Sequence, residues 1–193
     1  MITRGPGSTR LLNASTSLRI VLIPAVMGLV LLGGEHTSGA YPAAASLFAL
    51  AALTDFFDGY LARRWRMTTT FGSFLDTTAD KLLVACALIS LVAVDRASPW
   101  IAAVIVAREL VILGLRGVVA ADGLVIKPSS WGKIKTTVQF VAITLAILRP
   151  GEPVGSLFLD EWAMLVAALV TVVSGVEYLT RFASSLSSSP HSR

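Results

Sequence analysis

The chain has 193 residues, of which 54% are hydrophobic and 15% are charged, and its mean hydropathy is +0.74. This composition argues against a water-soluble domain of the same length and favours a protein with several membrane spans. The formal net charge of +4 at pH 7 is modest. No basic, aromatic-rich surface segment of the kind used by nucleic-acid-binding proteins is present, so nucleic acid is not an expected partner.

Six segments are apolar enough to be membrane-spanning helices, which need about 20 residues to cross a bilayer. Stretches rich in Gly, Pro and Asp separate them, and no strand-like alternation competes with the helical interpretation. The segments cover residues 18–32, 43–62, 74–94, 100–121, 134–148 and 161–182. We therefore predict an all-α, polytopic integral membrane protein with six transmembrane helices. The first and fifth segments are short, and we expect their helices either to extend into less apolar flanks or to tilt little.

Lysine and arginine predict the orientation of these spans, because they favour the cytoplasmic side. With six spans, nearly all of them fall on one side, and the opposite side carries Arg96 and Arg149. We therefore expect a multi-pass protein of the cytoplasmic membrane with both termini, the 63–73 loop and the 122–133 loop in the cytoplasm. A single transmembrane domain is expected over residues 1–183, followed by a tail, residues 184–193, whose composition predicts disorder.

Four aspartates stand at the cytoplasmic ends of the second and third segments. Asp55 and Asp58 are three residues apart, and Asp76 and Asp80 are four apart, so each pair shares a helix face. Because a short loop makes the two helices neighbours, we expect the four carboxylates to converge. Each aspartate at the centre of a span costs roughly 2.5–3.5 kcal/mol. Two bound Mg²⁺ ions, with Mn²⁺ or Ca²⁺ as substitutes, would relieve this cost and the mutual repulsion.

Two alternatives remain open for these aspartates. In the first, they face water or pair with neighbouring cations, namely Arg63, Arg64, Arg66 and Lys81. In the second, they belong to a divalent-cation transporter, which would spread its carboxylates over several spans near the midplane. The spacing on adjacent helices favours a metal site over simple pairing, and the position at one rim beside arginines argues against a cation path.

Taken in order, the residues of this region read D-x2-D-G-x2-A-R-x8-G-x3-D-x3-D. The fixed positions are Asp55, Asp58, Gly59, Ala62, Arg63, Gly72, Asp76 and Asp80. This pattern resembles the signature of the CDP-alcohol phosphatidyltransferase family. The resemblance implies a six-span, homodimeric membrane enzyme that transfers the phosphatidyl group of CDP-diacylglycerol to an alcohol, with CMP as the leaving group and the active site facing the cytoplasm.

The same resemblance implies roles for individual residues. The four aspartates would bind two Mg²⁺ ions, and Asp80 would be the general base that accepts the proton of the attacking hydroxyl. A segment before the first span resembles the family's N-x-x-T-x-x-R, and its polar positions are Asn13, Thr16 and Arg19. The residues expected to bind the CDP-lipid are Asn13, Thr16, Gly59, Arg63 and Thr69. For Asn13, a helix N-cap is an equal alternative.

The fourth segment carries charges within an apolar stretch. Arg108, Glu109 and Arg116 would lie in hydrocarbon unless they face a cavity, and the two arginines, eight residues apart, share nearly one helix face. We expect Glu109 to orient an arginine or to make a structural ion pair. Such a basic set suits an anionic alcohol. The residues expected to bind the acceptor's phosphate are Arg108, Arg116, Lys133 and Lys135.

The pattern R-E-L-x-V/I-x-x-L-R, followed by S-x-x-G-K-x-K-T, resembles the phosphatidylglycerophosphate synthase subfamily. That resemblance implies sn-glycerol 3-phosphate as the acceptor. Phosphatidylinositol phosphate synthases, which also use a phosphorylated alcohol, are the first alternative, and the cardiolipin synthases of the same family are the second.

Overall fold

The computed structural model describes residues 6–33, 39–65, 70–121 and 130–187, with side chains over 17–33, 39–54, 75–120, 132 and 134–184. The described chain forms six α-helices, together with one isolated β-bridge between Val154 and Leu157. The helices are α1 (Pro6–Leu32), α2 (Ala40–Trp65), α3 (Thr70–Ala93), α4 (Pro99–Ala121), α5 (Ser130–Leu148) and α6 (Leu159–Ser187). The predicted all-α fold is confirmed.

Each predicted apolar segment coincides with one helix, and several helices extend beyond it. α1 begins at Pro6 and α5 at Ser130, so both short segments continue into their flanks as expected. α6 ends at Ser187, past the boundary predicted at residue 183. Proline suits the first turn of a helix, where its missing N–H is not needed, and this explains the starts of α1 and α4.

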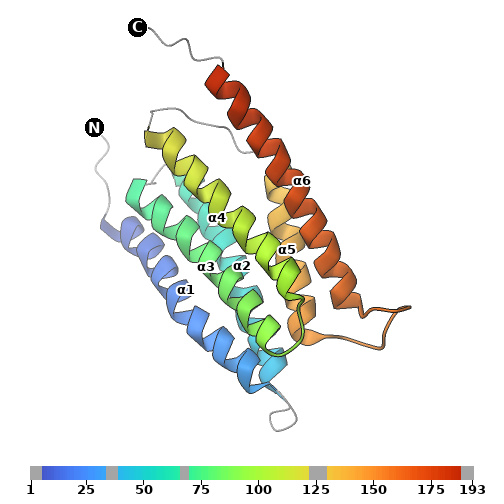
Figure 1. Ribbon diagram of the computed structural model, residues 1–193. Helices are drawn as coiled ribbons and strands as arrows, with labels where there is room; N and C mark the ends of the chain where they lie inside the picture. Colours follow the sequence, from blue (N-terminus) through green and yellow to red (C-terminus); the bar gives the residue numbers. More distant parts are fainter. Residues whose placement is uncertain (1–5, 34–38, 66–69, 122–129, 188–193) are drawn as a thin grey trace, which may run out of the picture.

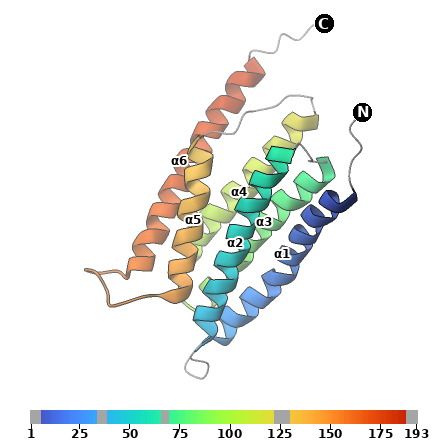
Figure 2. The ribbon, with the colours of Figure 1, turned by 180° about the vertical axis from the view of Figure 1, so that it is seen from behind.

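Successive helices run in alternating directions, so α1, α3 and α5 begin at the same end of the bundle at which α2, α4 and α6 finish (Figure 1). We call this the N-terminal end. Around the bundle, the order of packed neighbours is α1, α3, α4, α6, α5, α2 and again α1, and the view from behind agrees (Figure 2). α2 and α3 meet, but less extensively than any of these pairs, because α1 packs against both.

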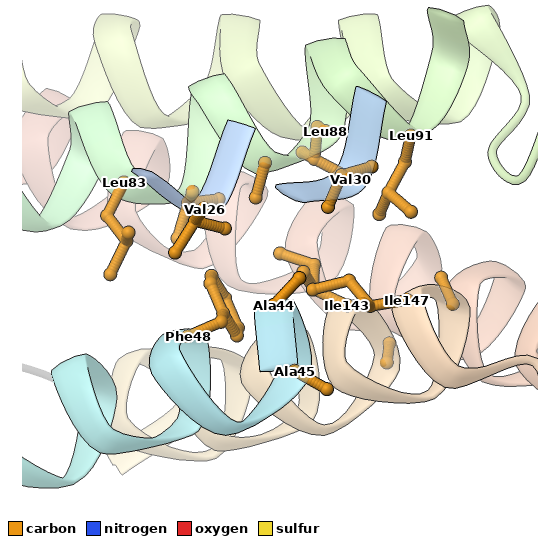
Figure 3. Packing of buried hydrophobic residues seen from close by; sticks show 14 of the residues in the cluster. Val26, Val30, Ala44, Ala45, Phe48, Leu83, Leu88, Leu91, Ile143 and Ile147 are labelled. Carbon is orange, nitrogen blue, oxygen red and sulfur yellow. The ribbon is translucent and has the colours of Figure 1, made fainter. Parts of the chain in front are cut away.

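Buried apolar side chains from α1, α2, α3 and α5 fill the centre of the bundle (Figure 3). Phe48 of α2 is fully buried, and its ring packs against Phe140 of α5, with centroids 5.6 Å apart and planes tilted by 55°. Small residues such as Ala44 and Ala146 are also completely buried. Small side chains let helices approach closely, and residues of all six helices contribute to this one buried cluster.

The outer surface is apolar, whereas several charged side chains are inside. Leu110 and Leu169 are 59% and 65% exposed, but Glu109 and Lys135 are 4% and 2% exposed. A water-soluble bundle shows the reverse arrangement. Judged by length and apolarity alone, one helix of the described chain, the stretch Leu159–Ser184, can cross a membrane. Shorter apolar stretches are Ser17–Leu32, Ala40–Thr54 and Ile134–Leu148.

The two basic residues predicted for the side opposite the termini lie at the other end of the bundle and tie its turns together. Arg96 donates a 2.6 Å hydrogen bond to the carbonyl of Ile147, and its guanidinium lies 3.5 Å from the centre of the Tyr41 ring. Arg149 pairs with Asp160 of α6 at 3.2 Å, and Asp160 is fully buried. These contacts brace the end of the bundle that is distant from the predicted site.

Candidate active site

α3 carries Asp76 and Asp80 one turn apart, near the N-terminal end of the bundle. Asp76 Oδ1 accepts a 2.8 Å hydrogen bond from Arg19 Nη1, which reaches across from α1. The Arg19 side chain is 2% exposed and that of Asp76 is 39% exposed. Asp80 Oδ2 lies 2.9 Å from the ammonium of Lys81. Its other oxygen, Oδ1, is buried and has no hydrogen-bond partner among the described atoms.

Asp55 and Asp58 lie in the last turns of α2, which finishes at the end of the bundle where α3 begins (Figure 1). Their side chains lie outside the described set, so the predicted convergence of all four carboxylates stays a prediction. Within the described side chains alone, no group of three His, Cys, Asp or Glu residues could hold a metal ion. The pairing of Asp80 with Lys81 agrees with part of the alternative in which the aspartates pair with neighbouring cations.

Several other predicted residues have a place in the backbone but no described side chain. Thr69 lies outside the described residues altogether. The residues placed on helices without a described side chain are Asn13 and Thr16 on α1, Gly59, Ala62 and Arg63 on α2, Gly72 on α3 and Lys133 on α5. Their predicted contacts with the CDP-lipid and with the acceptor remain predictions.

The donor set on α3 fits a divalent cation. Asp76 and Asp80 offer carboxylate oxygens from one helix face, and oxygen ligands are preferred by hard ions such as Mg²⁺. A buried acceptor without a hydrogen bond, such as Asp80 Oδ1, calls for a physical explanation. A cation held between α2 and α3 would satisfy that oxygen.

A second cluster of charges adjoins Asp80, where α3, α4 and α5 face one another. At its centre is Glu109 of α4, whose side chain is 4% exposed. Lys135 of α5 donates a hydrogen bond to Glu109 Oε1, and Arg108 Nη1 lies 3.3 Å from the same oxygen. Lys81 Nζ lies 2.9 Å from Oε2. This last contact is an ion pair rather than a well-directed hydrogen bond, since Oε2 has no hydrogen-bond partner of good geometry.

Lys81 therefore touches two carboxylates at once, Asp80 on its own helix and Glu109 on α4. It links the predicted metal-binding helix with the predicted acceptor-binding helix. Counting formal charges over this group, three cations (Lys81, Arg108, Lys135) face two carboxylates (Asp80, Glu109). One positive charge remains in excess, which favours the binding of an anion at this cluster.

Arg108 continues the polar contacts towards α6. Its Nη2 donates a 2.9 Å hydrogen bond to Ser174 Oγ, while its Nε is buried without a hydrogen-bond partner among the described atoms. Gly175 makes room for the side chain, because a Cβ built at that position would lie 3.2 Å from Arg108 Cγ. Deeper in the bundle, Gln139 of α5 donates to Thr171 of α6 at 2.8 Å.

Arg116 lies two turns beyond Arg108 on α4, and its guanidinium is 5.4 Å from the centre of the Tyr178 ring of α6. Tyr178 is 6% exposed, and its hydroxyl has no hydrogen-bond partner in the described part of the chain. Both arginines thus reach α6, as their common helix face predicts. Glu109 makes more ion pairs than the sequence predicts, because it contacts two lysines as well as an arginine.

Comparison with known proteins assigns this arrangement to a family. The family model described as CDP-alcohol phosphatidyltransferase matches residues 10–173, which include all six helices in whole or in part. The chain belongs to the CDP-alcohol phosphatidyltransferase family. The matched region contains the four motif aspartates and the whole cluster around Glu109, so the resemblance inferred from the motif is confirmed.

Curated relatives are similar over most of the chain. A CDP-diacylglycerol–glycerol-3-phosphate 3-phosphatidyltransferase of Bacillus subtilis is 43% identical over 180 residues, covering 88% of this chain and 93% of the relative. A probable phosphatidylglycerophosphate synthase of Mycobacterium tuberculosis is 41% identical over 172 residues, covering 89% of this chain and 80% of the relative. A Rickettsia typhi relative with the same name as the first is 37% identical over 169 residues, with coverages of 86% and 93%.

Within this phosphatidyltransferase, sequence reasoning missed the contribution of α6. Thr171, Ser174 and Tyr178 are buried and follow one another at intervals of three and four residues, so they share a face of an otherwise apolar helix. That periodicity is the signal that could have identified them. The sequence indicates Lys81 only as an alternative partner of the aspartates. Its role as a bridge to Glu109 depends on how α3 and α4 pack, which no local pattern indicates.

Proposed function

We propose that this phosphatidyltransferase transfers the phosphatidyl group of CDP-diacylglycerol to sn-glycerol 3-phosphate, forming phosphatidylglycerophosphate and releasing CMP. The observation that carries the proposal is the adjacency of two groups on one chain. The motif carboxylate Asp80 lies beside a buried cluster with an excess of positive charge. The names and the 37–43% identity of relatives that align with most of the chain support the choice of acceptor.

In this reaction the acceptor's free hydroxyl oxygen bonds to the phosphorus that carries the diacylglycerol group. The pyrophosphate bond to the cytidine monophosphate breaks, and CMP leaves with the electron pair. We assign Asp80 as the general base that accepts the hydroxyl proton. Its side chain is 13% exposed, so it retains limited access, and its position is restrained by Lys81. Gly59, Arg63 and Thr69, with Asn13 and Thr16, are proposed to bind the CDP-lipid.

The charged acceptor requires cations, and the α4–α5 region offers them. We propose that the acceptor's phosphate is bound by Arg108, Arg116, Lys133 and Lys135. Arginine presents several N–H donors in a plane and suits phosphate oxygens, and Arg108 has a buried Nε without a partner among the described atoms. Lys135 is 2% exposed and held by Glu109, so it contributes its charge from the base of the cluster.

We propose that Asp55, Asp58, Asp76 and Asp80 hold two Mg²⁺ ions, for which Mn²⁺ can substitute. When bound, such ions neutralise the pyrophosphate and the oxygen that departs with CMP. The support from this chain is the spacing of the four carboxylates and the unpartnered, buried Asp80 Oδ1. The protein's part is to hold the carboxylates at adjacent helix ends and to keep the two substrates within reach.

We further propose that all six helices span the cytoplasmic membrane, with both termini and the active site on the cytoplasmic side. The inverted surface supports this: leucines such as Leu110 and Leu169 point outward while charged side chains are enclosed. Enclosed charges lower the average hydropathy of a helix without meeting lipid. The one-sided distribution of Lys and Arg supports the orientation. The homodimer is proposed on the resemblance to the family.

The test is an acceptor comparison on the purified protein in lipid vesicles containing CDP-diacylglycerol, with Mg²⁺ supplied. Glycerol 3-phosphate, inositol phosphate or phosphatidylglycerol is added, and CMP release is followed. We expect CMP release with glycerol 3-phosphate. Release with inositol phosphate alone would overturn the acceptor assignment. Folded protein that releases no CMP with any of the three would overturn the proposed reaction.

A further inference from the structure

We propose that Glu109 is a positioning residue of this transfer reaction. The buried Lys135 anchors its carboxylate. Glu109 in turn fixes the ammonium of Lys81 against Asp80 and the guanidinium of Arg108 towards α6. The inference rests on the proposed function and deepens it. It assigns the carboxylate a task that neither metal binding nor direct contact with a substrate requires.

The first support is the geometry of the shared lysine. Lys81 Nζ lies 2.9 Å from Asp80 Oδ2 and 2.9 Å from Glu109 Oε2. A lysine side chain has four flexible bonds and would otherwise sample many positions. A second carboxylate on a neighbouring helix confines it. Because the ammonium holds one oxygen of Asp80, confining the ammonium also restrains the carboxylate proposed to act as the base.

The second support is the gradient of burial. Glu109 and Lys135 are 4% and 2% exposed, whereas Lys81 and Arg108 are 20% and 15% exposed. The buried pair forms the interior of the cluster, and Lys81 and Arg108 are the two cations that are more accessible. An ammonium has three donors and a guanidinium five, so both can hold Glu109 and still donate to a phosphate.

The third support is energetic. A buried ion pair gives little net stability compared with apolar side chains of the same volume, but the loss of one partner is strongly destabilising. Stability alone therefore explains poorly why three cations from three helices meet at one carboxylate. A requirement for fixed cation positions explains it directly, since each contact to Glu109 sets the place of one cation head.

The test is a double-mutant cycle in kcat, measured by CMP release from CDP-diacylglycerol vesicles with glycerol 3-phosphate. The variants are Glu109→Gln, Lys81→Gln and the combination. Groups that support a metal site from outside typically change activity by roughly 10- to 100-fold when they are removed, and we expect such a loss in kcat for Glu109→Gln. Because Glu109 acts on Asp80 through Lys81, the double variant should lose no more than the more damaged single variant.

The Michaelis constants separate positioning from a structural role. Glu109→Gln loosens Arg108 and should therefore raise KM for glycerol 3-phosphate severalfold. KM for CDP-diacylglycerol should stay within about twofold of the original value. A variant that merely folds less well would lose kcat with both KM values unchanged. The matched control is Glu152→Gln, the same substitution in the exposed turn between α5 and α6, which should leave all three parameters unaltered.

If Glu109→Gln does not fold, Glu109→Asp keeps the charge and withdraws it by one methylene. It should show the same pattern with a smaller loss. Losses in kcat that multiply in the double variant, or an unchanged acceptor KM in a folded Glu109 variant, would overturn the inference. Failure of the proposed function is distinguishable, because the unmodified protein would then release no CMP with glycerol 3-phosphate. In that case, the cycle is run with whichever acceptor is active.

Discussion

Gly175 offers the sharpest test of the polar contacts between α4 and α6. A methyl group added by Gly175→Ala would lie 3.2 Å from Arg108 Cγ and 3.8 Å from Arg108 Nε. The first distance is tighter than ordinary van der Waals contact, so the flexible arginine must shift by a few tenths of an ångström. Its guanidinium is held by Ser174 at 2.9 Å and only loosely by Glu109 at 3.3 Å, and these contacts will lengthen.

Two effects of opposite sign follow from this substitution. Alanine is favoured over glycine within a helix by about 0.5–1 kcal/mol, so the folded protein should be no less stable than before. A displaced Arg108 should also make a weaker hydrogen bond to the acceptor's phosphate. Since a hydrogen bond to a charged group is worth about 1.5–3 kcal/mol, weakening it partly should cost the bound acceptor about 1 kcal/mol. That energy corresponds to roughly a fivefold increase in KM for glycerol 3-phosphate.

The assay measures CMP release at varied glycerol 3-phosphate and, separately, at varied CDP-diacylglycerol, together with the thermal unfolding midpoint. The matched control is Gly114→Ala, the same change on α4 at a position where a Cβ would meet nothing within 4 Å. We expect the acceptor KM to rise for Gly175→Ala alone. Equal acceptor KM values for the two variants, with both proteins folded, would refute the role given to Arg108.

Three further predictions concern the carboxylates, the metal and the core. Asp80→Asn should abolish CMP release in protein that still folds, and near-normal turnover would remove Asp80 from the role of base. Chelation of divalent ions should stop the reaction, with recovery on addition of Mg²⁺ or Mn²⁺; activity that persists in thoroughly chelated protein would exclude the proposed ions. Phe48→Ala should lower the free energy of unfolding by about 3 kcal/mol, since the fully buried ring leaves a cavity. Leu50→Ala, at an exposed position, is its control, and an equal loss of unfolding free energy in the two variants would contradict the assigned core.

The sequence alone was sufficient for the helices and for the motif. Apolar segments of membrane-spanning length predict helices because a backbone in lipid must satisfy its own hydrogen bonds. The spacing of Asp76 and Asp80 places both on one face of α3, since helical periodicity is a local property. Local periodicity also carried a signal on α6, where Ser174 and Tyr178 interrupt an apolar run, although sequence reasoning did not use it.

Only the tertiary structure decided which charges meet. Arg19 and Asp76 are 57 residues apart, Lys135 and Glu109 are 26 apart, and Arg108 and Ser174 are 66 apart. Chain adjacency predicted α2 and α3 as direct partners, yet α1 packs against both more extensively. Periodicity states which face of a helix a residue occupies, but not which helix that face meets. The partners that Glu109 finds on α3 and α5 depend on the order of helices around the bundle, and that order is set by the packing of side chains in three dimensions.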